Sequence, residues 1–482
     1  MSTADRHRND PFTNTPIINN QSIDQNHHST PTDYNAAALA EVNVLLDQFA
    51  HFGVELGLDR IHRLLADLGN PQQQVSILHV AGSNGKGSVC AFLSSVLTEA
   101  GYRVGRYTSP HLVTWCERIC INQQEIAPTT LLHLLKQTIT AIRPDAPSPT
   151  QFEVITAAAW LYFAQQRVDI AVIEVGLGGR LDATNVCDRP LVSIITSLSR
   201  EHWQKLGPTL ADITREKAGI LKPGCPAVIA PQPPEATAVL QQRLTELNCP
   251  ALWVQPSIAT QSGWATFQNN LSIPSHPHFK LLPLTYPLPL PGLHQRVNSA
   301  LAIATLQWLQ HQGWKITEQQ IQQGMAKTQW PGRLQWIMWQ NHDILIDGAH
   351  NPAGAAMLRQ YLDYEIEHSD RVTPPIHWVM GMLSTKDHAD VFQALLRSGD
   401  SLHLVPVPDH LSANLEELAA LAQKTCPTLK DCQIYDNALA GLEAAIQSRS
   451  NSKPTLVLCG SLYLIGYFFK HLANEQSLNE QA

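Results

Sequence analysis

Short, mostly apolar segments alternate with longer stretches of helical periodicity along most of the chain. A strand that is apolar on both faces is typical of a parallel sheet covered by helices on both sides. Five such segments precede residue 231. The pattern therefore predicts an α/β domain built on a mostly parallel sheet. The predicted strands are residues 77–81, 104–108, 168–175, 191–196 and 227–230.

A second α/β series follows a break in this pattern. Helical spacing over residues 37–68 opens the first domain, and a proline-rich stretch over residues 283–291 interrupts regular structure before the helix carrying residues 298–309. The alternation resumes after Trp330-Pro331-Gly332. Because 482 residues are too many for one ordinary core, we predict two domains, residues 37–328 and 332–475. The strands predicted in the second domain are residues 344–347, 376–380, 402–407 and 455–459.

Neither end of the chain has the pattern of an export signal or a membrane span. Residues 1–36 are rich in Ser, Thr, Asn, Asp and His and have no apolar core, so we predict a disordered tail rather than a signal peptide. Residues 456–469 are the most hydrophobic late stretch, but 14 residues are too few to cross a bilayer. We predict a buried strand running into a helix there, and no membrane partner.

Charge and cysteine usage exclude further classes of protein. The formal net charge is −8, and no run of Lys and Arg is long enough to follow a nucleic-acid backbone, so no nucleic-acid partner is expected. The nine cysteines form no CxxC pair, which argues against a zinc site or a disulfide framework. Reduced thiols indicate a cytoplasmic protein, and a small anionic substrate remains compatible with a few cations in one cleft.

The most specific local motif is a glycine-rich loop between a predicted strand and an apolar helix, with the sequence Val-Ala-Gly-Ser-Asn-Gly-Lys-Gly-Ser. Gly82, Gly85 and Gly87 permit a tight turn whose N–H groups point inward. Lys86 adds a charge for the β- and γ-phosphates. Because Gly87 separates Lys86 from Ser88, the spacing differs from that of the common P-loop. The motif predicts a nucleoside triphosphate site, and the alternative is an ordinary turn capped by Ser88.

Three candidate magnesium ligands stand at the ends of predicted strands. Glu174 ends one apolar strand, Ser109 follows a second, and His202 follows a third. In open α/β sheets, ligands bind outside the carboxyl ends of the strands. These side chains could therefore converge on one Mg²⁺ ion, with water and phosphate oxygens completing its shell. Taken singly, Ser109 also fits a helix cap and His202 a hydrogen-bonded loop histidine.

Two neighbouring features are less specific. The glycines that follow Glu174 (Gly176, Gly178 and Gly179) lack the spacing of a dinucleotide fingerprint, which argues against a dehydrogenase. Lys217 lies on the next predicted helix, and its residue type alone favours a solvated helix lysine.

Together these segments resemble the folylpolyglutamate synthase/dihydrofolate synthase family, of the bifunctional bacterial type, within the Mur ligase superfamily. The resemblance runs from about Glu41 to Phe469 and rests on motifs in a fixed order. It departs from the family at Ser83, where Thr is usual, and at Glu201, where Asp is usual before the histidine. The matching segments are residues 52–71, 82–88, 107–112, 152–153, 174–185, 202–222, 292–298, 330–352, 386–387 and 460–463.

The resemblance implies an N-terminal P-loop-type ATPase domain, a smaller C-terminal Rossmann-like α/β domain, and catalysis in the cleft between them. The implied catalytic residues are Lys86, Lys217 and His350. The implied metal ligands are Ser109, Glu174, His202 and Lys217, the last in carbamylated form rather than as a solvated lysine. The implied ATP contacts are Asn84, Gly85, Lys86, Gly87, Ser88, Asn298, Arg333 and Asp347. The implied pterin-side contacts are Thr150, Gln151, Phe152, Glu153, Leu181, Asp182 and Ala183.

The implied reaction is an ADP-forming amide ligation that adds L-glutamate to dihydropteroate and to tetrahydrofolate polyglutamates through an acyl phosphate. ATP and two Mg²⁺ ions are the implied cofactors, and the resemblance implies a monomer. Two alternatives remain. One is a Mur-type cell-wall peptide ligase. The amino-acid sequences of residues 82–88 and 174–185 argue against it. The other is a nucleotide-gated binding protein that hydrolyses ATP without forming an amide.

Overall fold

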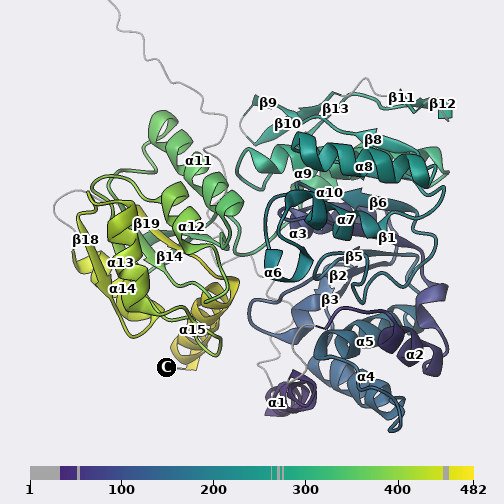
Figure 1. Ribbon diagram of the computed structural model, residues 1–482, viewed down its shortest axis with the longest axis horizontal. Coiled ribbons are helices and arrows are strands. Elements are labelled where there is room, and N and C mark those ends of the chain that lie inside the picture. The colour runs from purple at the N-terminus through teal and green to yellow at the C-terminus, as the bar shows by residue number, and fades with distance from the viewer. Residues whose placement is uncertain are drawn as a thin grey trace, which may run out of the picture.

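Two α/β domains lie side by side in the computed structural model (Figure 1). The structure describes residues 33–50, 55–261, 263–268, 272–273, 276–448 and 455–481. Most of the predicted tail, residues 1–32, lies outside the described residues. Residues 33–36, which we assigned to that tail, form the first turn of helix α1 (Asp33–Asp47).

An eight-stranded sheet forms the centre of the N-terminal domain. Its strand order is β4-β3-β2-β5-β1-β6-β7-β8. Six strands run parallel, and β3 and β4 join antiparallel at one edge. The five strands predicted from apolar segments are all present, at most three residues shorter than expected. The strands are β1 Ile77–Ala81, β2 Val104–Tyr107, β3 Ile119–Ile121, β4 Gln124–Glu125, β5 Ile170–Glu174, β6 Val192–Ile195, β7 Ala227–Ile229 and β8 Ala251–Trp253.

Helices cover both faces of this sheet, which explains why central strands such as β1, β5 and β6 are buried along their whole length. Leu78 and Val172 point into a core shared with α3, α9 and α10. Ile77 and Ile173 point to the opposite side, into a core shared with α1, α2, α4 and α5. Alternate residues of one strand thus enter different cores. The remaining helices are α2 Asp59–Asp67, α3 Lys86–Glu99, α4 Pro128–Thr140, α5 Gln151–Gln165, α6 Trp203–Leu206, α7 Leu210–Lys217, α8 Pro234–Glu246, α9 His294–His311 and α10 Glu318–Ala326, with 3₁₀ turns η2 Pro71–Gln74, η3 Trp115–Arg118 and η4 Ala218–Ile220.

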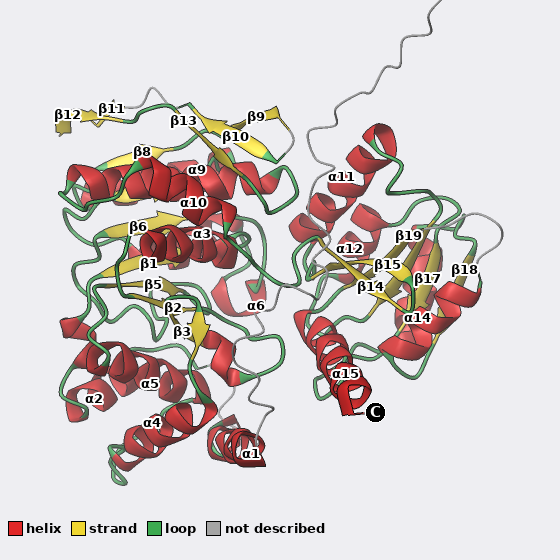
Figure 2. Cartoon of the chain, turned by 180° about the vertical axis from the view of Figure 1, so that it is seen from behind, coloured by secondary structure: helices red, strands yellow, loops and turns green. Residues whose placement is uncertain are grey.

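Small strands that the sequence did not predict lie beyond the β8 edge (Figure 2). We expected the proline-rich stretch to lack regular structure, but β13 lies within it. Proline is tolerated there because β13 is an edge strand of a three-stranded sheet with the order β13-β10-β9. The added strands are β9 Ile258–Gln261, β10 Trp264–Phe267, β11 Ser272–Ile273, β12 His276–Lys280 and β13 Leu284–Pro287.

The C-terminal domain has a six-stranded sheet with the order β14-β15-β19-β16-β17-β18. All four predicted strands are present, and β14 and β18 are additional. β14 pairs antiparallel with β15 across a two-residue turn in which Gln340 and Asn341 have positive φ. The strands are β14 Gln335–Trp339, β15 His342–Asp347, β16 Ile376–Met380, β17 Ser401–Leu404, β18 Asp431–Ile434 and β19 Thr455–Cys459, and the helices are α11 Pro352–His368, α12 His388–Leu395, α13 Leu415–Thr425, α14 Ala438–Gln447 and α15 Leu462–Gln481.

The hydrophobic stretch near the C-terminus has the predicted form. Strand β19 is buried along its whole length and is followed directly by α15. Across the described part of the chain, no helix is both long enough and apolar enough to cross a membrane.

Candidate functional site

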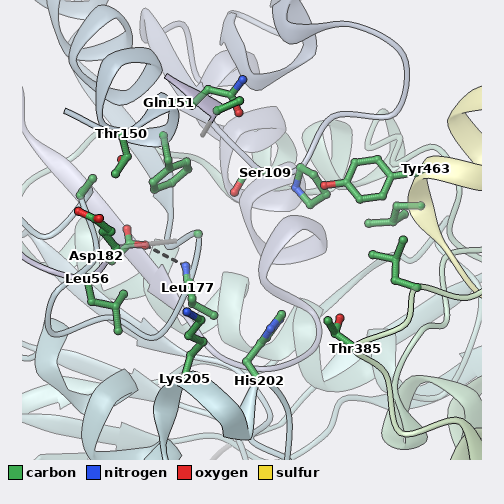
Figure 3. Close-up of a pocket in the computed structure, with 18 of the residues that line it drawn as sticks. Leu56, Ser109, Thr150, Gln151, Leu177, Asp182, His202, Lys205, Thr385 and Tyr463 are labelled. Carbon is green, nitrogen blue, oxygen red and sulfur yellow. Dashed lines mark hydrogen bonds between the residues drawn. The ribbon is translucent and has the colours of Figure 1, made fainter. Parts of the chain in front are cut away.

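A cavity of about 670 Å³ lies where the two domains meet. The N-terminal domain supplies the residues around the ends of β2 and β5 and the start of α5. The C-terminal domain supplies residues near 350, 385 and 461. Figure 3 shows Thr150 and Asp182 on one side of this cavity, and Thr385 and Tyr463 on the other. A ligand here would therefore contact both domains at once.

The predicted phosphate loop joins β1 to α3 beside this cavity. Gly82 and Gly85 have φ values of 152° and 92°, which only glycine adopts readily. Helix α3 begins at Lys86, so the free N–H groups of its first turn face the loop. Lys86 Nζ donates to the Gly82 carbonyl at 3.1 Å. The loop thus has the turn, the helix start and the cation that a triphosphate requires.

Helix α9 and Trp330, which lies between the two domains, pack directly against this loop. A Cβ atom at position 85 would lie 2.3 Å from Asn298 Oδ1, and one at position 87 would lie 2.4 Å from the Trp330 ring. Asn298 is held by a hydrogen bond from its Nδ2 to Gln295 Oε1 at 3.0 Å. The structure therefore places Asn298 against the loop, although it lies 213 positions after Gly85 in the sequence.

We predict that Gly87→Ala impairs the loop through a steric clash. The new methyl group must displace Trp330, and overpacking of this kind costs about 1–3 kcal/mol. Thermal unfolding and the KM for ATP should both report the change. Gly87→Ala/Trp330→Ala should recover loop function relative to Gly87→Ala alone, and a double variant no better than the single one would contradict this account.

Two of the predicted metal ligands are in direct contact. The Ser109 N–H donates to Glu174 Oε2 at 3.2 Å. Burial raises the pKa of Glu174, while Lys86 and the Ser109 N–H act in the opposite direction. His202 lines the same cavity and has a left-handed φ of 47°. Among the described residues, no group of three or more His, Cys, Asp or Glu side chains is arranged to hold a metal ion.

Lys217 is a buried residue, so the alternative of a solvated helix lysine is wrong. Its side chain is 3% exposed, and its Nζ donates to Glu201 Oε1 and to the Gly82 carbonyl, each at 2.8 Å. Burial disfavours the charged forms of both Lys217 and Glu201. For Glu201 the positive charges of Lys217 and Lys86 outweigh this effect and lower its pKa to about 2. Lys217 therefore ties α7 to the first residue of the phosphate loop.

The three residues predicted in the C-terminal domain cluster at the end of β15. Asp347 accepts hydrogen bonds from the N–H groups of Leu334 and Ala349, each at 2.8 Å. A Cβ atom at Gly348 would lie 2.0 Å from Arg333 Nη1. Asp347 thus holds the backbone directly after Arg333 and that of Ala349.

His350 lines the cavity with one ring nitrogen already committed. Its Nδ1 lies 2.8 Å from the Gly348 carbonyl, which requires a proton on that nitrogen. Burial and the neighbouring charge of Lys386 lower the pKa of His350 to about 3. The ring is therefore neutral at pH 7, and its Nε2 carries a lone pair.

All seven predicted pterin-side residues line the cavity. Thr150 caps α5 through a reciprocal pair in which Glu153 Oε2 accepts the Thr150 N–H at 2.7 Å. Glu153 Oε1 is buried and has no hydrogen-bond partner among the described residues. Asp182 accepts the Leu177 N–H at 2.8 Å (Figure 3). Burial raises the pKa of Asp182 even though several donors oppose it.

Direct hydrogen bonds also join the domains near the cavity. Asn351 Nδ2 donates to Asn84 Oδ1 at 3.1 Å, and Trp203 Nε1 donates to Asp387 Oδ1 at 3.2 Å. Asn84 belongs to the phosphate loop, so this loop contacts the second domain directly.

Several cavity residues were absent from the predicted site. Arg118, Lys205, Lys386 and Tyr463 line the cavity, and all but Arg118 fall within the motif segments that carry the family resemblance. Arg118 lies ten residues after the predicted strand 104–108, in a turn that has no glycine and no repeated spacing to mark it. Their shared location depends on the packing of distant segments.

Family models and known proteins match most of the chain. Residues 80–306 match the Mur ligase middle domain, and residues 333–471 match the C-terminal domain of dihydrofolate synthetase. The chain is 33% identical to the dihydrofolate synthase/folylpolyglutamate synthase of Bacillus subtilis over 87% of its own length and 96% of that protein. It is 32% identical to the enzyme of that name from Escherichia coli, over 90% and 96% of the two chains.

Solved structures agree with this assignment. A Mycobacterium tuberculosis folylpolyglutamate synthase complexed with ADP and AMPPCP superimposes with a TM-score of 0.76 at 30% identity, covering 90% of this chain and 98% of that one. E. coli FolC in complex with DHPP and ADP gives a TM-score of 0.74 at 29% identity, covering 92% and 99%. The protein therefore belongs to the dihydrofolate synthase/folylpolyglutamate synthase family.

Proposed function

We propose that this chain is an ATP-dependent, ADP-forming ligase that joins L-glutamate to dihydropteroate and to tetrahydrofolate and its polyglutamates. The main support for this proposal is that one continuous cavity connects the two domains. It runs from the seven predicted pterin-side residues, past Ser109 at the end of β2, to Lys386 and His350 of the second domain. A substrate with a ring system at one end and a carboxylate at the other fits this arrangement.

In the proposed mechanism the acceptor carboxylate attacks the γ-phosphate of ATP, and ADP leaves. The amine of glutamate then attacks the resulting acyl phosphate, and phosphate departs. Lys86, now bonded to the Gly82 carbonyl, would turn to the transferring phosphoryl group and offset its charge. The neutral ring of His350 would accept a hydrogen bond at Nε2 from the attacking amine and so orient it.

The metal ligands remain part of this proposal. Ser109 and His202 line the cavity, and Glu174 contacts Ser109, so their oxygen and imidazole donors would hold Mg²⁺ together with water and phosphate oxygens. The ion would neutralise charge on the phosphates. A carbamylated Lys217 would add an anionic ligand for a second ion. In the structure its amine is buried beside the loop, where such a group would face the phosphates.

ATP would be held by the loop residues Asn84–Ser88 together with Asn298, Arg333 and Asp347. Asp347 uses both carboxylate oxygens for backbone N–H groups, so its proposed contribution is largely to position the Arg333 segment. Closure of the second domain would exclude water from the acyl phosphate. The nine cysteines are free thiols, which supports a reducing compartment such as the cytoplasm. Because one chain supplies both walls of the cavity, we expect a monomer.

Product analysis with defined acceptors tests this function. With ATP, Mg²⁺ and L-glutamate, the purified protein should convert dihydropteroate and tetrahydrofolate to glutamate conjugates and release one ADP for each amide formed. Release of ADP without a conjugate would favour the nucleotide-gated binding protein. Turnover of a UDP-muramoyl peptide acceptor instead would favour a cell-wall ligase, which the match of residues 333–471 to a dihydrofolate synthetase domain does not support.

A further inference from the structure

Arg118 is a buried cation for which the described part of the chain offers no carboxylate partner. It ends the turn η3, lines the cavity and is only 8% exposed. Its Nε donates to His111 Nδ1 at 2.9 Å, and its guanidinium lies 4.3 Å from the centre of the Trp115 ring. These contacts fix the plane of the group but do not neutralise it. An unpaired buried charge is costly, so a ligand anion would complete this site.

A second buried arginine, Arg359, is by contrast paired with carboxylates of the protein itself. Arg359 is 7% exposed, close to the value for Arg118. Its guanidinium lies 2.6 Å from Asp363 and 3.7 Å from Asp400. Arg359 does not line the cavity, and the protein itself supplies its counter-charges. Arg118 differs in both respects.

The acidic groups nearest to Arg118 are occupied elsewhere. Glu117 accepts three backbone N–H groups, those of residues 112–114, at 2.5–2.7 Å. Glu174 accepts the Ser109 N–H and belongs to the proposed metal site. Neither carboxylate forms an ion pair with Arg118 within the described residues. The guanidinium stays charged at any physiological pH, so its remaining N–H donors are available to a planar anion.

The proposed reaction brings carboxylates of both the acceptor and the incoming glutamate to this cavity. The reacting carboxylate must approach the phosphates near Lys86, and the incoming glutamate would face Lys386 and His350 of the second domain. Arg118 lies on the N-terminal wall, which also carries the pterin-side residues. A pteroylglutamate has an α-carboxylate that dihydropteroate lacks and that ligation does not consume.

We propose that Arg118 binds the α-carboxylate of the glutamyl residue on folate acceptors and thereby determines the preference for folates over dihydropteroate. This inference rests on the proposed function and names the residue that separates its two acceptors. His111 and Trp115 are positioning residues, since they act by holding the guanidinium in one plane. Bidentate pairing of Arg with a carboxylate suits this geometry.

The test compares two acceptors and two ligands in Arg118→Gln. The kcat/KM for tetrahydrofolate should fall on the order of 10- to 100-fold, the value expected for a lost charged hydrogen-bonded pair, while that for dihydropteroate stays unchanged. In a fluorescence titration without ATP, the variant should lose the same factor in affinity for folic acid but not for pteroic acid. The KM for L-glutamate should not change.

Matched variants separate recognition from folding. Arg359→Gln also removes a buried guanidinium and should lower stability, yet leave the ratio of the two acceptors unchanged. If Arg118→Gln does not fold, Arg118→Lys replaces it, because it keeps the charge but loses the bidentate geometry. An equal loss for both acceptors, or a rise only in the KM for L-glutamate, would overturn the inference. A wild type that ligates neither acceptor would refute the proposed function instead, while the two titrations would still decide the role of Arg118.

Discussion

Lys86→Ala should lower the rate of ligation by about 100- to 1,000-fold, the loss typical when a preorganised charge in an active site is removed. Lys86 begins α3, and its Nζ donates to the loop carbonyls of Gly82 and Ser83. Folding depends little on these two hydrogen bonds, so the cost to stability should be about 1 kcal/mol. Single-turnover formation of ADP and of the conjugate measures the effect directly.

A surface lysine provides the control for this variant. Lys136 is half-exposed and pairs with Glu41 on the outside of the domain, so Lys136→Ala should ligate at the wild-type rate. If Lys86→Ala also ligated at that rate, the loop would not be the phosphate site.

Lys217→Met should both destabilise the protein and abolish ligation. The substitution leaves Glu201 as a buried carboxylate without its partner, and breaking a buried pair in this way costs about 3–5 kcal/mol. The activity is lost because Lys217 Nζ also holds the Gly82 carbonyl at the start of the phosphate loop. Urea unfolding and the ligation assay measure the two effects separately.

The double variant Lys217→Met/Glu201→Leu distinguishes the two roles. Removing both charges should restore most of the stability but none of the activity. If Lys217 acts as a carbamate, small carboxylates should partly rescue Lys217→Ala, and mass spectrometry under CO₂ should detect the added group on the wild type. A Lys217→Met protein as stable as the wild type would contradict the ion pair.

The same pair predicts how stability depends on pH. The pKa of Glu201 falls to about 2 in the folded protein, below its value of about 4.3 in an unfolded chain. A carboxyl group with a lowered pKa stabilises the fold fully above the unfolded value. That contribution is lost as the pH falls from about 4.3 towards 2. The loss in this window should be smaller in Lys217→Met/Glu201→Leu than in the wild type.

The sequence predicted the central strands because burial on two faces leaves a strong local signal. Strands β1, β16 and β19 have the predicted bounds, since each is buried to its last residue. The edge strands β13 and β14 were missed. An edge strand exposes one side to solvent and mixes polar and apolar residues, so its pattern resembles that of a loop.

Site residues were predictable only where a motif marks them. Glycine spacing identified the loop, and strand ends identified Ser109 and Glu174. The pairing of Lys217 with Glu201 joins an α7 residue to a loop, and no periodicity in either segment indicates it. Arg118 has no motif of its own, and that the described residues offer it no carboxylate partner becomes visible only when its surroundings are known.

The contact between Trp330 and Gly87 has a mechanical consequence. Trp330 stands two residues before Gly332, where the second domain begins, and it packs on the nucleotide loop. If the second domain rotates about the segment around Trp330, the axis of that rotation lies beside the proposed phosphate loop. In such a rotation, the parts of the second domain furthest from Trp330 would move the most. Small rotations would admit and release the amino acid and the acceptor while the triphosphate keeps its alignment.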